Sequence, residues 1–156
     1  MALVPLQHAS RQEIFTALFN LLQTLPPPTG SNQWNTFTQT VKEWTDYDAS
    51  EQPVMTLARG AQNFILKAPG ILRVHFKVAL LIYFRADGFL TTNTYPDQVT
   101  DSMLDSIEQL FTPQGVDQYL TLGGIVQNCW IDGNIYSDPG INDPQCVILV
   151  PISIVV

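Results

Sequence analysis

Charged side chains are scarce in this chain of 156 residues. They make up 13% of the sequence, against roughly 25% in a typical soluble domain, while 46% of the residues are hydrophobic. Fourteen acidic residues and seven lysines and arginines give a net charge of −7. This balance opposes adhesion to nucleic-acid phosphates and to anionic membranes. It also leaves much neutral or apolar surface, which is typical of a chain that associates with copies or partners.

The residues of common catalytic and metal sites are few. The two histidines, His8 and His75, stand in no recognisable motif, and the sequence holds no nucleophile elbow and no phosphate-binding loop. The two cysteines, Cys129 and Cys146, lack the short spacing of metal ligands. They lie on two arms of one predicted hairpin but out of register for a disulfide, so two reduced thiols are expected. We therefore expect no enzyme activity, no metal and no cofactor.

Long apolar runs and targeting segments are also lacking. No run approaches the ~20 apolar residues that a membrane helix needs, so no membrane partner is predicted. The first ten residues have neither the basic region nor the apolar core of an export signal. At its length the chain is predicted to form one domain, residues 1–156, with a sizeable core.

Helix and strand signals alternate along the chain. Ser10 and Glu13 make a capping box that begins a helix, and the prolines at 26–28 end it. A second amphipathic helix is predicted from 97 or 100 to 111. Strands are predicted at 34–44, 54–59 and 72–84 and in two hairpin arms within 122–156, with 60–70 as a long connection. The order α-β-β-β-α-β-β predicts an α+β fold, a mainly antiparallel sheet of four to five strands with two helices on one face.

The final stretch, residues 146–156, carries no charged side chain. Its even-numbered and odd-numbered positions are both apolar, which excludes an ordinary strand with one wet face. Pro151 cannot donate a ladder hydrogen bond, which indicates an edge position or a bulge. An apolar edge strand needs a cover, and we expect another copy of the chain or a partner to supply it. The residues predicted to lie between subunits are Ile148, Val150, Ile152 and Ile154.

Three carboxylates of the second helix, Asp101, Asp105 and Glu108, fall on one helix face. A solvated face is the simplest interpretation of such a stripe. Like charges at this spacing also slightly destabilise a helix. A divalent metal site of a small hydrolase is a rival interpretation, and thermal stabilisation by metal is its test.

An ordered set of motifs resembles one known family. Its members are the capped first helix, a strand ending at Trp44, Gln52-Pro53-Val54 leading into a short strand, the long alternating strand, the acidic helix, Leu122-Gly123-Gly124, the stretch Trp130 to Gly133, and the closing QCVILVPISIVV. The set spans almost the whole chain, and it resembles the tail terminator, or tail completion, proteins of long-tailed bacteriophages.

The resemblance implies an α+β subunit of a ring, usually a hexamer, without enzyme activity or cofactor. Such a ring caps the head-proximal end of the tail tube, stops its growth and joins the tail to the neck or head, while DNA passes through its centre. The implied partners are further copies of the chain, the tail tube protein and a neck or head-completion protein. The implied location is the virion, in the tail or neck, after assembly in the host cytoplasm.

Two surface roles are hypotheses within this resemblance. The first is that Asp101, Asp105 and Glu108 line the ring lumen, where negative charge repels DNA in transit; an outer solvated face is the alternative. The second is that the connection 60–70 docks onto the tail tube or a neighbouring subunit and becomes ordered on contact. The residues expected to carry that docking are Phe64, Ile65 and Leu66.

Other functions fit the same sequence features. The nearest alternative is another phage neck or tail ring protein, either a head–tail connector or a tube subunit, which assembles from similar small subunits. A tube subunit is expected to polymerise into long hollow fibres, whereas a terminator stops at one or two rings. A stand-alone ligand-binding domain is a further alternative and would be a monomer with a closed apolar pocket.

Overall fold

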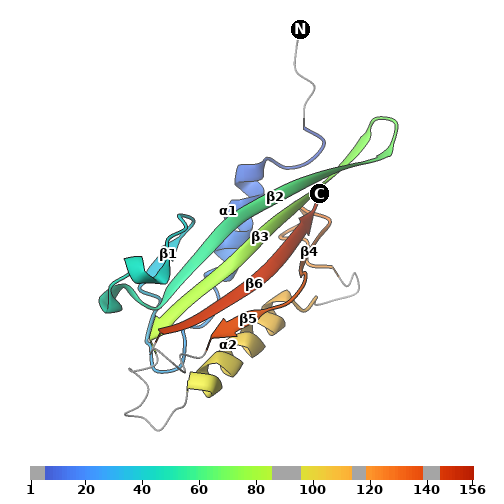
Figure 1. The fold of residues 1–156 in the computed structure, drawn as a ribbon. Helices are drawn as coiled ribbons and strands as arrows, with labels where there is room; N and C mark the ends of the chain where they lie inside the picture. The colour runs from blue at the N-terminus through green and yellow to red at the C-terminus, as the bar shows by residue number, and fades with distance from the viewer. Residues whose placement is uncertain (1–5, 86–95, 114–118, 139–144) are drawn as a thin grey trace.

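The computed structural model describes residues 6–85, 96–113, 119–138 and 145–156. Within these residues a six-stranded sheet has the order β1-β2-β3-β6-β4, and β5 also pairs with β6 (Figure 1). β1 is parallel to β2, and the other pairs are antiparallel. The elements are α1 (Arg11–Leu22), β1 (Thr36–Thr38), the 3-10 helices η1 (Trp44–Asp46) and η2 (Ala49–Glu51), β2 (Val54–Ala68), β3 (Ile71–Arg85), α2 (Pro96–Phe111), β4 (Asn128–Ile131), β5 (Tyr136–Asp138) and β6 (Gln145–Val155). The predicted α+β fold is confirmed.

Helix α1 begins as the sequence predicts. The Ser10 hydroxyl accepts a hydrogen bond from the Glu13 amide at 3.2 Å, and the Glu13 carboxylate accepts one from the Ser10 amide at 3.1 Å. This capping box satisfies two amide groups that lack partners within the helix. One face of α1 is buried against the sheet, through Ile14, Phe15, Leu18 and Leu22.

The core lies between the two helices and one face of the sheet. Even-numbered residues of β3 from 74 to 84 and of β6 from 146 to 154 are buried together with the apolar stripes of α1 and α2. The register explains this, because Leu80 pairs with Val150 and Ile82 pairs with Ile148, and paired residues point to the same face. Each such side chain contributes about 1.5–3 kcal/mol when fully buried.

Strand β6 is an inner strand, with β3 on one side and β4 and β5 on the other. Pro151 lies opposite the break between these two short strands, since β4 ends at Ile131 and β5 begins at Tyr136. The Asp132 amide donates to the Pro151 carbonyl at 3.0 Å. The N–H and C=O groups of one strand residue point toward the same neighbouring strand. The N–H group that proline lacks would therefore have pointed into the gap between β4 and β5. The predicted edge position is thus wrong, and the pairing of β6 with β3 continues through Pro151 without the register shift of a bulge.

Strand β2 is much longer than predicted. Residues 60–70, expected as a connection, belong for the most part to the strand Val54–Ala68, which pairs with β3. A register shift at Gly60 hides the strand in the sequence, because a bulge changes which side chains face the core. A Cβ on Gly60 would lie only 2.8 Å from the Lys77 carbonyl oxygen, so the close approach of the two strands requires a glycine there.

The first predicted strand, 34–44, is shorter than expected. Only Thr36–Thr38 pairs with β2, and the chain then turns through η1 and η2. Trp44 and Tyr47 from this segment pack with Val54 and Tyr83. These residues lie on the sheet face opposite the helices, so the segment covers one end of that face.

Candidate functional site

The predicted subunit contact along β6 is contradicted by the structure. Its four residues lie in the core of the single chain, each at most 1% exposed: Ile148, Val150, Ile152 and Ile154. Helices α1 and α2 of the same chain cover this face of the sheet, so no surface is left there for another copy. The opposite side of β6 is partly exposed, at Val147, Leu149, Pro151 and Val155.

One polar cluster on this helix-free face joins three segments. The Lys77 ammonium on β3 forms an ion pair with Asp132, after β4, and donates to Ser153 Oγ on β6 at 2.7 Å. Ser153 Oγ in turn donates to the Asp132 carboxylate at 2.6 Å. The hydrogen bond from Lys77, followed by that from Ser153, lowers the pKa of Asp132.

The same cluster resembles the serine–lysine pairs of some hydrolases, in which a neutral lysine activates the serine. Here the Lys77 ammonium is held in an ion pair with Asp132 and is not a free base beside the serine. Ser153 is also fully buried, and its hydroxyl is already bonded to both neighbours. The arrangement therefore acts as a link between β3, β6 and the β4–β5 turn. Sequence reasoning missed it because Lys77 and Asp132 are 55 residues apart.

The β2–β3 hairpin projects beyond the rest of the molecule (Figure 1). We call residues 62–73 the arm. Phe64 pairs with Val74, and Leu66 pairs with Leu72, so all four side chains lie on the face that α1 covers further along the sheet. Val74 is only 2% exposed, whereas Phe64, Leu66 and Leu72 are 54%, 69% and 44% exposed. The arm thus continues the core face of the sheet into solvent.

Ile65 lies on the other face of the arm, since it alternates with Phe64 and pairs with Arg73. The three predicted docking residues are therefore in a strand and do not share one surface. On the face of Ile65, a shallow hollow of about 430 Å³ is lined by Lys67, Ile71, Arg73, His75 and Val155. One face of the arm is apolar, and the other mixes the cations Lys67 and Arg73 with Ile65 and the exposed Ile71.

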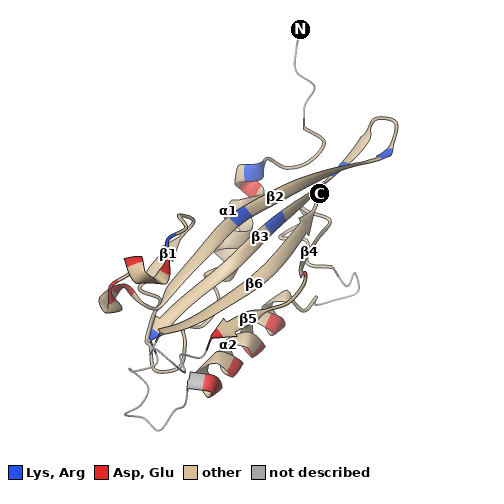
Figure 2. Ribbon diagram, in the orientation of Figure 1, with Lys and Arg blue, Asp and Glu red and all other residues tan. Residues whose placement is uncertain are grey.

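Charge is strongly segregated along the chain. Strands β2 and β3 together carry five of the seven cations and no acidic residue, whereas α2 carries four acidic residues and no cation (Figure 2). Asp101, Asp105 and Glu108 are all exposed, along the solvent side of α2. Within the described ranges, no group of three His, Cys, Asp or Glu side chains is placed to hold a metal ion.

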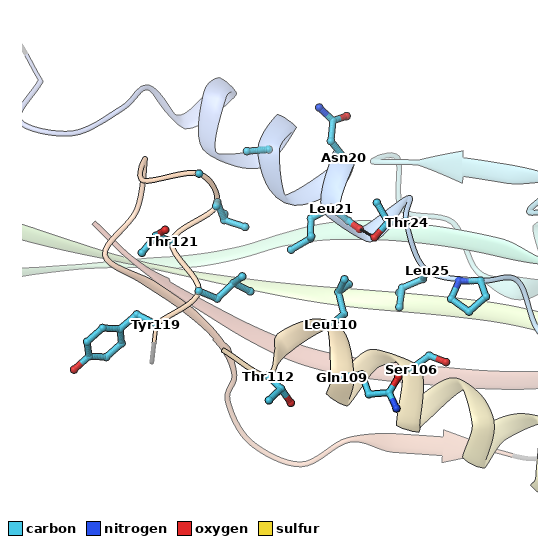
Figure 3. A pocket seen from close by; sticks show the side chains of 15 residues that line it. Asn20, Leu21, Thr24, Leu25, Ser106, Gln109, Leu110, Thr112, Tyr119 and Thr121 are labelled. Atoms are coloured by element: carbon cyan, nitrogen blue, oxygen red, sulfur yellow. Dashed lines mark hydrogen bonds between the residues drawn. The ribbon is translucent and has the colours of Figure 1, made fainter. Parts of the chain in front are cut away.

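A groove of about 880 Å³ runs between α1, α2 and the segment before β4 (Figure 3). It is open to solvent. Apolar side chains from all three elements line it, and polar side chains such as Asn20, Gln109 and Thr121 stand among them. The apolar lining consists of Ala17, Leu21, Leu25, Pro26, Leu110, Tyr119, Leu120 and Leu122. Sequence reasoning missed the groove because Leu21, Leu25 and Leu110 read as ordinary members of buried helix stripes.

Both cysteines are buried thiols outside any disulfide. Cys129 pairs with Ile154 and Cys146 with Phe84, so the register separates the two thiols along β6. Burial raises the pKa of Cys129 to about 12, which keeps this thiol protonated and unreactive at neutral pH.

No helix in the described part of the chain is long and apolar enough to cross a membrane. No known protein family matches the sequence, and no curated protein matches it either. The exposed arm, the groove and the acidic stripe of α2 are the surface features open to a partner.

Proposed function

We propose that this chain is a structural subunit of a closed ring that ends the tail tube of a long-tailed bacteriophage. The ring caps the head-proximal end of the tube, stops its growth and joins the tail to the neck or head. Its partners are further copies of the chain, the tail tube protein and a neck or head-completion protein, and its place is the virion. The ordered motifs from Ser10 to the closing QCVILVPISIVV support this proposal.

The exposed apolar face of the arm is the observation that carries the proposal. Phe64, Leu66 and Leu72 stand side by side on one face and are each more than 40% exposed in the single chain. Full burial of one such side chain is worth about 1.5–3 kcal/mol, so covering all three favours association. A contact between two different surfaces of identical subunits closes into a ring when its rotation allows.

The acidic balance of the chain supports the passage of DNA through the ring. A net charge of −7 weakens non-specific binding to phosphates. In this proposal the exposed carboxylates Asp101, Asp105 and Glu108 face the lumen and repel DNA during transit.

A native mass measurement of the purified protein tests the proposal. We expect about six copies per particle, and electron microscopy should show single or paired rings. Long hollow fibres would favour the alternative of a tube subunit. A single copy at all concentrations would contradict ring formation and leave the stand-alone domain as the better explanation.

A further inference from the structure

We infer that the apolar face of the arm seats in the α1–α2 groove of a second copy of this chain. The inference rests on the proposed ring and names the two surfaces that meet within it. The arm supplies Phe64, Leu66 and Leu72. The groove supplies the half-buried Leu21 and Leu110, and Leu25 in its lining is only 4% exposed.

The arm lacks the cover that its own sheet receives elsewhere. Along the body, Phe15 of α1 packs against Phe76 with ring centroids 5.5 Å apart. The cover thins at the start of α1, where Arg11 lies over the Phe76 ring and donates to Gln62 at 3.0 Å. The His8 ring also meets Phe76 edge-on, with centroids 6.3 Å apart. The segment before α1 reaches the arm tip through one hydrogen bond, from Gln7 Nε2 to the Gly70 carbonyl at 2.9 Å. The apolar face beyond Gln62 nevertheless remains exposed, so a helical layer from outside the chain is the natural continuation.

The groove offers such a layer. Its two walls are helices, as on the covered part of the sheet, and leucine side chains line it (Figure 3). The outer edge of β2 needs polar partners as well, because β1 pairs only with residues 54–56 and the rest of that edge has no strand partner in the described chain. Asn20, Gln109 and Thr121 of the groove can donate to and accept from such free backbone groups.

The distribution of charge indicates that a second copy of the chain covers the arm. Strands β2 and β3 hold five cations and no acid, and the remainder of the chain holds two cations and fourteen acids. The arm itself holds two of the five cations, Lys67 and Arg73, and no acid. It is therefore attracted to the helical side of another copy, where α2 carries four acids and no cation. Two arms repel each other, which disfavours a symmetric contact between tips. The contact is thus head to tail, the kind that closes into rings.

Engineered cysteines test the contact directly. Phe64→Cys places a thiol on the arm, and Ser106→Cys places one in the groove. Both native cysteines are buried, so we expect little disulfide formation from them. Under mild oxidation we expect a mixture of the two single variants to form disulfide-linked dimers about ten-fold faster than either variant alone, because bound sites have a high effective concentration. The double variant should give a ladder of linked chains, since the arm points away from α2 in its own chain (Figure 1).

Thr45→Cys is the matched control, an exposed position outside the groove. The inference is overturned if Phe64→Cys links to Ser106→Cys no faster than to Thr45→Cys, or if Phe64→Cys links mainly to itself. Native mass measurement of the reduced samples distinguishes failure of this contact from failure of the proposed ring. Rings without the specific link defeat this contact alone, whereas monomers throughout defeat the proposed ring as well.

Discussion

Gln52 and Gln145 are 93 residues apart and exchange two buried hydrogen bonds, at 2.9 and 3.0 Å between side-chain nitrogen and oxygen. Gln145 also donates to the Phe84 carbonyl at 3.1 Å, and the Gln52 carbonyl accepts from Asn35 at 2.6 Å. The pair joins the start of β2 to the start of β6, across β3. Two buried amides are satisfied by each other, so the pair fixes how the two ends of the sheet meet.

Replacing one of these amides should therefore destabilise the fold. We expect Gln145→Leu to lower the free energy of unfolding by about 1–3 kcal/mol, because Gln52 is left buried without its partner. The double variant Gln52→Leu with Gln145→Leu should lose less than the sum of the single variants. Urea denaturation measures these values, with exposed Gln12→Leu on α1 as the control. Strictly additive losses would show that the two amides are not coupled.

The ion pair between Asp132 and Lys77 should make stability depend on pH. The pKa of Asp132 is lowered in the folded chain, so its contribution is present above the ordinary aspartate pKa and is lost as the pH falls through the folded value. Both side chains are partly exposed, so solvent screening limits the contribution to less than about 1 kcal/mol.

Asp132→Asn tests this dependence. The variant should be less stable than the wild type at pH 7, and the difference should shrink as the pH falls below about 4. Salt should reduce the difference at pH 7. Urea denaturation at a series of pH values measures it. An unchanged difference in acid would mean that the carboxylate contributes through packing and not through charge.

Substitution of Ile152 tests whether this side chain lies in the core or between subunits. The structure places this side chain in the core at 1% exposure, so Ile152→Asp buries an unpaired carboxylate and should cost more than about 4 kcal/mol. We expect loss of the folded circular dichroism spectrum and not a folded monomer. The conservative Ile152→Val should remain folded, with a loss of about 0.5–1.5 kcal/mol. A well-folded Ile152→Asp monomer would contradict the assignment of this face to the core.

The arm offers the opposite test. Phe64→Ser combined with Leu66→Ser removes exposed apolar side chains, so the thermal midpoint of the isolated chain should hardly change. Assembly should weaken strongly, because these side chains are proposed to be covered in the ring. Sedimentation velocity measures the loss of rings. The exposed Val41→Ser, outside the arm, is the control. Rings that persist in the arm variant would remove the arm from the assembly contact.

Much of the fold follows from local patterns. The capping box and stripe of α1, the alternation of β3 and the stripe of α2 each report burial on one face, and the structure confirms all three. Single helices and strands of this kind are predictable because the spacing of apolar residues depends only on residues close together in the sequence. The covered face of β6 was harder, since apolar residues on both sides mark burial without showing whose side chains cover them. Its own helices do so on the even-numbered side.

The candidate sites depended on long-range geometry. The arm was hidden because Gly60 and the polar Gln62 and Asn63 interrupt the apolar pattern of β2, and such breaks are typical of loops. Lys77 and Asp132 meet only through the register of β3, β6 and β4. A bulge shifts parity by one residue, so the sequence alone does not tell which side chains share a face beyond it.

The acidic stripe of α2 gives the last test. We expect the triple variant Asp101→Asn, Asp105→Asn and Glu108→Gln to assemble more weakly, because α2 also attracts the arm of the neighbouring copy. The rings that form should retain duplex DNA at low salt, because repulsion in the lumen is removed. A second triple variant, with Glu43→Gln, Asp46→Asn and Asp48→Asn in the exposed η1–η2 segment, is matched in charge and serves as the control. Retention of DNA by rings is measured by cosedimentation at a series of salt concentrations. Equal retention by both variants would show that net charge matters and that the α2 stripe has no special place in the ring.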